Sequence, residues 1–139
     1  MTVKIDFPYV DFPPMYIPEE QLINIIQPRT ISNPEMSDSE VIKAGLKKPI
    51  GTSTLRNLIK KGQKILILVD DYTRITPTQI ILPMVMSELG TVGISREDIK
   101  ILIASGTHRS MNIEEKKRKY GRNIIDNYKI IDHNWGDEN

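Results

Sequence analysis

Two polar clusters hold the residues best suited to chemistry. The first, DDYTR, covers residues 70–74, and the second, SGTHR, covers residues 105–109. An arginine presents a planar fork of donors that suits a carboxylate or a phosphate. A histidine titrates near neutral pH and therefore suits general acid or base work. Arg74 is thus a candidate anion ligand, and His108 is a candidate acid or base.

These candidates also have ordinary structural interpretations. Acidic residues like the pair that opens DDYTR commonly end a strand and cap the next helix. An exposed arginine such as Arg74 commonly pairs with a neighbouring carboxylate at little gain in stability, and a single loop histidine such as His108 is commonly just solvated. His133 has no partner in its surroundings and keeps this interpretation. The cations at residues 116–119 are interpreted as a solvated helix face.

Apolar segments precede both clusters and should position them. KILILVD at residues 64–70 and DIKILIAS at residues 98–105 are short, apolar and bounded by turn residues. This pattern is typical of a strand that is covered on both faces. YKIIDH at residues 128–133 is a third strand candidate, and it is followed by the polar segment DHNWGDEN.

Helical patterns separate the three strand candidates. We expect a helix from Pro77 to Leu89, with Thr76 as its cap and Gly90 as its stop. A short charged helix, IEEKKRKYG, follows the second strand. The resulting βαβαβ order predicts an open, Rossmann-like α/β domain with a parallel sheet, right-handed crossovers and helices on both faces. Ligands of such sheets bind at the carboxyl ends of the strands, so both clusters should meet at one rim.

A proline-rich extension at residues 1–34 precedes the expected α/β domain at residues 35–139. Proline restricts VKIDF and PMYIP in this extension to edge strands or extended loops. The domain should open with a helix that is capped by Ser37 and Glu40. No helical pattern follows the last strand, so we expect the domain to be incomplete at its C-terminus. A further domain or a second copy of the chain would then cover the exposed strand.

The composition narrows the functional classes. The chain has 139 residues, 39% of them hydrophobic and 27% charged, a net charge of +1 and no cysteine. Disulfides, thiolate metal sites and cysteine nucleophiles are therefore excluded. The chain has no basic stripe that would indicate nucleic-acid binding. It also has no apolar run that would indicate a membrane span or a signal peptide. The motifs GxxxxGK[ST] and GxGxxG are also absent. We expect a cytoplasmic protein that binds a small molecule.

Both clusters and the helix between them resemble a known family. DDYTRITP, then ILPMVMSELG, then DIKILIASGTHRSMNIEE are similar to the N-terminal domain of the nickel-pincer lactate racemase family. The shared motifs are Asp-Asp-x-Thr-Arg after one strand and Gly-Thr-His-Arg after the next. YKIIDHNWGDEN is similar as well. The resemblance covers residues 64–139 well and the proline-rich N-terminus loosely.

The resemblance implies a racemase or epimerase of 2-hydroxy acids. Members of the family use a nickel-pincer pyridinium mononucleotide, which takes the substrate's α-hydrogen as hydride and returns it to either face. Two histidines exchange the hydroxyl proton, and an arginine holds the substrate carboxylate. By this resemblance Arg74 and His108 are catalytic residues, and no residue of this chain is a metal ligand. The matched motif positions that remain are implied cofactor contacts: Asp71, Thr73, Gly106 and Thr107.

The chain also departs from the family pattern. Ile75 stands where a proline often follows the motif arginine, and His133 is the only other histidine. The family's second catalytic histidine, its cofactor-bearing lysine and its nickel-ligating histidine all lie beyond the matched region. We therefore expect neither tight cofactor binding nor turnover from this chain alone. One alternative is a non-enzymatic module that binds a small anion or a nucleotide at the same rim. Another is an interaction domain that merely keeps the sheet.

Overall fold

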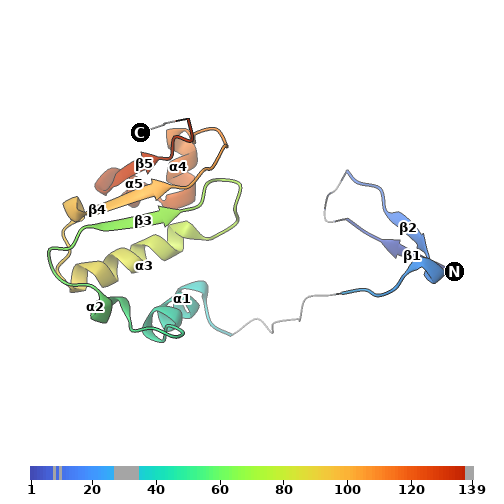
Figure 1. The fold of residues 1–139 in the computed structure, drawn as a ribbon, viewed down its shortest axis with the longest axis horizontal. Helices are drawn as coiled ribbons and strands as arrows, with labels where there is room; N and C mark the ends of the chain where they lie inside the picture. Colours follow the sequence, from blue (N-terminus) through green and yellow to red (C-terminus); the bar gives the residue numbers. More distant parts are fainter. Residues whose placement is uncertain (8, 10, 27–34, 137–139) are drawn as a thin grey trace. The chain divides into compact units, whose positions relative to one another are not determined.

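The computed structural model describes residues 1–7, 9, 11–26 and 35–136. The chain divides into two compact units, Met1–Asn33 and Pro34–Asn139, and each is drawn with its elements in Figure 1. The boundary expected after residue 34 falls at the edge of a stretch, 27–34, that lies outside the described residues.

The first unit is built on a short hairpin. Strand β1 (Thr2–Ile5) pairs antiparallel with β2 (Met15–Pro18), and a single 3-10 turn, η1 (Glu19–Gln21), follows. Pro18 lies at the last position of β2, where a missing backbone N–H costs the ladder little. The ring of Phe12 lies 6.0 Å from that of Phe7 and 5.8 Å from that of Tyr9. VKIDF and PMYIP therefore do contribute the two strands of a minimal sheet.

The second unit contains the parallel sheet that the sequence predicts. Strands β3 (Ile65–Val69), β4 (Ile99–Ile103) and β5 (Lys129–Asp132) lie in the order β3-β4-β5, and both pairings are parallel. Helix α3 (Thr78–Thr91) and the 3-10 turn η2 (Arg96–Asp98) connect β3 to β4. Two helices, α4 (Ile113–Tyr120) and α5 (Arg122–Asn127), connect β4 to β5. The predicted α/β class is confirmed, and α5 is an element that was not predicted from the sequence.

The helices cover only one face of the sheet, so the expectation of helices on both faces is wrong for the described residues. Inward side chains of all three strands form one apolar core with those of α3, α4 and α5. The three strands are added one after another in a single direction. Right-handed crossovers then place every connecting helix on the same face, and the second face is reached only where the strand order reverses.

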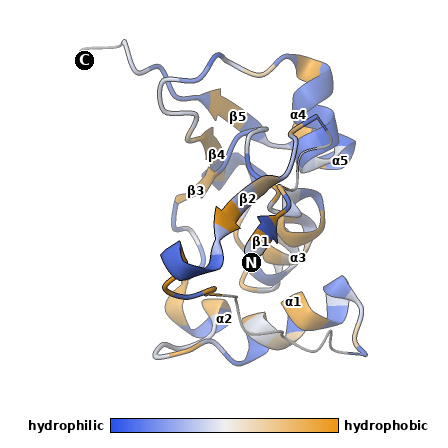
Figure 2. Cartoon of the chain, turned by 90° about the vertical axis from the view of Figure 1, so that its right-hand side faces the viewer, coloured by the Kyte–Doolittle hydropathy of each residue, from blue (hydrophilic) through white to orange (hydrophobic). Residues whose placement is uncertain are grey.

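The opposite face of the sheet is open. Leu66 and Leu68 of β3 point away from the core, and 65% of Leu68 is exposed. Leu68 pairs with Leu102 of β4, which in turn pairs with Ile131 of β5, so the three apolar side chains form one row across the sheet. In Figure 2 these strands carry hydrophobic colours, whereas α4 is mostly hydrophilic. The open face therefore carries one apolar row, beside a second row in which Leu66 pairs with Lys100 and Lys100 with Lys129.

The core on the covered face is continuous. Its fully buried members come from every layer: Leu89 of α3, Ile101 and Ile103 of β4, Tyr120 of α4 and Ile124 of α5. The larger cluster around them consists of Val69, Leu82, Met86, Ile94, Ile99 and Met111. This core fixes the distance between α4 and the loops at the ends of the strands.

Two further helices precede the sheet and contact α3. Helix α1 (Asp38–Lys47) begins at the predicted capping box of Ser37 and Glu40. Helix α2 (Leu55–Leu58) is only about one turn long. Its Arg56 forms a two-pronged ion pair with Glu88 of α3. Among the residues that the structure describes, none of the helices has both the length and the apolar character needed to cross a membrane.

The one-sided burial predicts very different costs for two leucine truncations. Leu89→Ala removes a side chain that is 1% exposed and should lower the free energy of unfolding by about 2–5 kcal/mol. Leu68→Ala, on the open face, should cost less than about 1 kcal/mol. Urea denaturation of both variants measures the difference. Equal costs would mean that the open face is covered in solution.

Candidate functional site at the carboxyl ends of the strands

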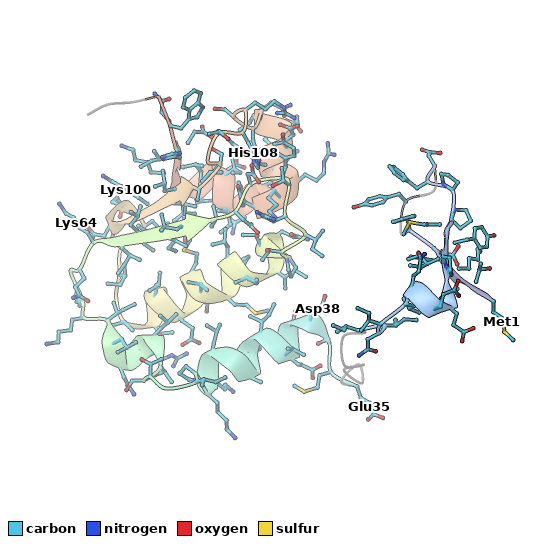
Figure 3. The ribbon with its side chains drawn as sticks, turned by 45° about the vertical axis from the view of Figure 1, so that its right-hand side comes forward. Met1, Glu35, Asp38, Lys64, Lys100 and His108 are labelled. Carbon is cyan, nitrogen blue, oxygen red and sulfur yellow. The ribbon has the colours of Figure 1, made fainter. Side chains whose placement is uncertain are left out.

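The loops that follow β3 and β4 are in direct contact. The carboxylate of Asp71, in the first loop, lies 2.6 Å from Nδ1 of His108, in the second. Figure 3 shows His108 at the end of the sheet opposite Lys64, which precedes β3. The parallel arrangement therefore brings DDYTR and SGTHR to one rim, as expected from the topology.

Asp71 is a buried, fully engaged carboxylate. Only 3% of it is exposed, and its Oδ1 accepts hydrogen bonds from the backbone N–H of Thr73 (3.1 Å) and from the Thr73 hydroxyl (2.6 Å). Burial by itself raises the pKa of Asp71, but the hydrogen bonds from Thr73 and His108 outweigh it and hold the pKa below its ordinary value. The carboxylate is therefore ionised at neutral pH.

His108 is held on one side and open on the other. Its side chain is 47% exposed although Nδ1 contacts Asp71. A carboxylate at Nδ1 favours the tautomer with the proton on that nitrogen, which leaves Nε2 able to accept a proton from a ligand. The backbone N–H of His108 closes a turn by donating to the carbonyl of Ser105 at 3.0 Å. Gly106 adopts φ +57° in this turn, a conformation that favours glycine.

Asp70 has a different role from its neighbour, because it fixes the entry into α3. It accepts hydrogen bonds from the hydroxyls of Thr76 (2.5 Å) and Thr78 (3.2 Å). Burial raises the pKa of Asp70, whereas these hydroxyls and Lys119 lower it, with a net decrease. The expected cap at Thr76 is wrong: Pro77 occupies that position, and the helix runs through Gly90 to Thr91. The Thr76 hydroxyl is unavailable for capping because it binds Asp70.

Two side chains of helix α4 bind backbone carbonyls of the loop after β3. The ammonium of Lys119 donates to the carbonyls of Arg74 (2.6 Å) and Thr76 (3.1 Å) and lies 3.2 Å from the carboxylate of Asp70. The hydroxyl of the next residue, Tyr120, donates to the carbonyl of Asp70 at 2.8 Å. Both ends of the loop are thus attached to two consecutive residues of one helix.

The interpretation of residues 116–119 as a solvated helix face is therefore wrong for Lys116 and Lys119, whereas Arg118 is exposed. Lys119 is only 10% exposed, and Lys116 pairs with Asp132 at the end of β5 at 2.5 Å. The signal for this inward face was present in the sequence. Lys116, Lys119 and Tyr120 follow the i, i+3, i+4 spacing of a single helix face, and a buried tyrosine beside a lysine indicates that the lysine also turns inward.

Arg109 joins the two loops to α4 from the outside. Its guanidinium binds both oxygens of Glu115, at 2.9 and 2.6 Å, and lies 4.6 Å from the ring centre of Tyr72. The hydrogen bonds from Arg109, together with one from the Asn112 backbone, lower the pKa of Glu115 to about 2. Arg109 was expected at the rim as the last residue of SGTHR, and its partners Glu115 and Tyr72 were not predicted.

Arg74 lines a pocket beside the Asp71–His108 pair. The pocket lies between the loop after β3 and helix α4, and its volume is about 440 Å³. Its lining consists of Tyr72, Arg74, Ile75, Thr76, Pro77, Gln79, Glu115, Arg118 and Lys119. Neither His108 nor His133 belongs to that lining. The structure thus brings Asp71, Thr73 and His108 together and places Arg74 in the adjoining hollow.

The other candidates lack side-chain partners within the described part of the chain. Thr107 is exposed on the second loop, and His133 contributes its backbone N–H to the carbonyl of Ile103 at 3.1 Å. The described residues contain no group of three or more histidine, aspartate or glutamate side chains that could hold a metal ion.

Comparison with known proteins confirms the resemblance to lactate racemases. The lactate racemase of Thermoanaerobacterium thermosaccharolyticum is 33% identical over 118 residues, which is 84% of this chain and 28% of that protein. The lactate racemase of Lactiplantibacillus plantarum is 35% identical over 99 residues, which is 71% of this chain and 23% of that protein.

A solved structure is also similar. The lactate racemase apoprotein from T. thermosaccharolyticum matches 96% of this chain with a TM-score of 0.72 and 30% identity, and the match covers 30% of that protein's chain. This chain therefore spans between about a quarter and a third of the relatives' lengths. Residues 12–139 match the family described as the lactate racemase N-terminal domain. Because this match includes nearly the whole chain, the protein belongs to the lactate racemase N-terminal domain family.

Proposed function

We propose that this chain is the N-terminal part of an isomerase that racemises or epimerises a 2-hydroxy acid. The observation that carries the proposal is the 2.6 Å contact between Asp71 and Nδ1 of His108 at the rim where Arg74 lines a pocket. The rim thus carries an oriented acid or base, His108, and a candidate anion ligand, Arg74. The family membership supports the same reaction class, since the similar full-length proteins are lactate racemases.

In this proposal Arg74 binds the substrate carboxylate. It is exposed in the pocket lining and has no ion pair among the described residues, so its fork of donors is available to a ligand. Bidentate contact fixes the orientation of a small acid as well as binding it. Its backbone carbonyl is held by Lys119, so the loop position of Arg74 does not depend on the ligand.

His108 exchanges the hydroxyl proton of the substrate. Asp71 accepts a hydrogen bond from Nδ1–H, which leaves Nε2 as the nitrogen that takes the hydroxyl proton and later returns it. An ionised Asp71 also stabilises the imidazolium that forms in between. Thr73 keeps the carboxylate in position through two hydrogen bonds. Asp71 and Thr73 thus act on the substrate through His108, while Gly106 and Thr107 form the turn that presents it.

The remaining parts of the site are assigned to additional polypeptide. By resemblance to the family, a nickel-pincer pyridinium mononucleotide would supply the acceptor for the α-hydrogen. The described residues contain no group of three or more side chains that could hold its metal by themselves. We assign the metal ligand, the cofactor-bearing lysine and the second acid-base histidine to a C-terminal domain that completes the cleft, or to another chain. A homo-oligomer is a further way to cover the open face, and the cytoplasm is the proposed location.

A non-enzymatic anion-binding module is the second candidate function. The observation that favours it is the cationic pocket itself, which contains Arg74, Arg118 and Lys119 without involving His108. Such a module would bind an anion through Arg74 and would be indifferent to changes at His108. The two functions are therefore separated by His108→Gln in the complete protein, which should abolish racemisation and leave anion binding in place.

The first prediction of the proposed function concerns Arg74 and anion binding. Lactate should shift the amide resonances of residues around the pocket, and Arg74→Ala should weaken this binding by about fivefold or more. Arg74→Lys should recover only part of it, because an ammonium lacks the planar fork. Arg122→Ala, at an exposed arginine outside the pocket lining, is the matched control. Equal binding by the Arg74→Ala and Arg122→Ala proteins would contradict the assignment.

The second prediction concerns Asp71 and pH. Because its pKa is lowered in the folded state, Asp71 should stabilise the protein above its unfolded pKa of about 3.9 and lose that contribution as the pH falls through the folded value. At pH 7, Asp71→Asn should lower the free energy of unfolding by about 1.5–3 kcal/mol. The deficit should vanish in strong acid.

Denaturant titrations at several pH values measure the Asp71 effect. Asp126→Asn, at an exposed aspartate of α5, is the control and should change stability by less than about 0.5 kcal/mol at any pH. A deficit in the Asp71→Asn protein that persists undiminished at the lowest pH would show that the side chain acts through shape and not through charge.

The third prediction concerns the chain by itself. The 139-residue chain should convert no L-lactate to D-lactate, with or without added nickel, because the second histidine and the cofactor-bearing lysine are assigned elsewhere. Chiral chromatography measures the product. The mass of the native protein from its source should exceed 15.9 kDa. Turnover by the isolated chain would refute the assignment of those groups to additional polypeptide.

A further inference from the structure

The pocket beside Arg74 contains more positive charge than a monocarboxylate needs. Its lining includes three cations, Arg74, Arg118 and Lys119, and one anion, Glu115. Its volume of about 440 Å³ lies in the range of small-molecule sites. Which of these charges remain available for a ligand depends on the partners that each already has.

Two of the four charges are already engaged. Glu115 is bound through both oxygens by Arg109, which approaches from outside the pocket. Lys119 lies 3.2 Å from Asp70 and donates to two backbone carbonyls, and only a tenth of its side chain is exposed. These groups therefore form the wall of the pocket and contribute little net charge to a ligand.

Two guanidinium groups remain. Arg74 comes from the loop after β3 and Arg118 from α4, and neither has a carboxylate within ion-pair distance in the described part of the chain. Arg118 does contribute to the lowered pKa of Glu114 and Glu115, after their hydrogen bonds to Lys117 and Arg109. Each of these glutamates thus has a closer cation, and the Arg118 fork stays open toward the pocket.

We propose that Arg118 is a second anion contact and that the pocket selects a dianionic 2-hydroxy acid, a hydroxy dicarboxylate, over a monocarboxylate. The inference rests on the proposed function, in which Arg74 binds the carboxylate next to the reacting carbon. A monocarboxylate would leave the second guanidinium without a counter-charge. A second carboxylate, whose carbon lies two bonds from the reacting carbon, would give each guanidinium its own partner.

The test compares malate with lactate on the 139-residue chain, by amide chemical-shift titration. Malate should bind about fivefold more tightly than lactate, as expected for one added, partly exposed ion pair. The preference should shrink in 0.5 M salt, because added ions screen exposed charges. Arg118→Gln should lower the affinity for malate about fivefold and reduce the preference to less than twofold, and Arg118→Lys should keep part of the preference.

Arg122→Gln is the matched control. It removes the same charge from the adjacent helix α5, outside the pocket lining, and should leave the preference for malate unchanged. A circular-dichroism spectrum and a urea midpoint for each variant show that it is folded. A loss of preference in the Arg122→Gln protein equal to that in the Arg118→Gln protein would overturn the proposal, since net charge alone would then explain the effect.

Succinate and inorganic phosphate complete the experiment. Succinate carries two carboxylates without the hydroxyl and should bind less tightly than malate, and phosphate should bind less tightly than either. Phosphate binding that is tighter than malate binding and depends on Arg118 would overturn the proposal in favour of a phosphate site. Lactate and malate affinities that are equal but depend on Arg74 would overturn the inference alone. Binding of both acids that is insensitive to Arg74 would instead overturn the proposed function.

Discussion

The burial of one ionised carboxylate, that of Asp71, is the constraint on which the rest of the site depends. A buried charge is costly unless it is paired and hydrogen-bonded. Asp71 meets this requirement only when the loop after β3 supplies Thr73 and the loop after β4 supplies His108. The same contact therefore satisfies the carboxylate, closes the two loops against each other and fixes which nitrogen of the imidazole faces a ligand. Strand pairing of β3 with β4 brings these loops within reach.

Two layers of support stand behind this contact. The apolar core packs α4 against the ends of the strands. The last two residues of α4, Lys119 and Tyr120, bind carbonyls at both ends of the loop after β3. Outside, Arg109 ties the second loop to Glu115 of the same helix. A helix that is mostly hydrophilic thus contributes more to the geometry of the site than to the core.

The sequence was sufficient for some of these features and not for others. DDYTR and SGTHR follow the two most apolar segments, so parallel topology alone places Asp71 and His108 at one rim. The roles of Lys119 and Arg109 could not be read in the same way, because they depend on how α4 is rotated and how far it lies from the loops. Coverage of the sheet was mispredicted because a run such as Ile65–Val69 is equally apolar whether one face or both are buried. The direction in which strands are added decides the matter, and no local pattern encodes it.

The anchoring of the loop through its backbone has an evolutionary consequence. Lys119 recognises the carbonyls of Arg74 and Thr76, and Tyr120 recognises that of Asp70. Every amino acid carries such a carbonyl, so the shape of the loop at positions 72, 74 and 75 is largely independent of the side chains there. Mutation can therefore explore new side chains facing the pocket without first losing the scaffold that presents them. A lineage built on this arrangement can change the chemistry of its pocket through single viable steps.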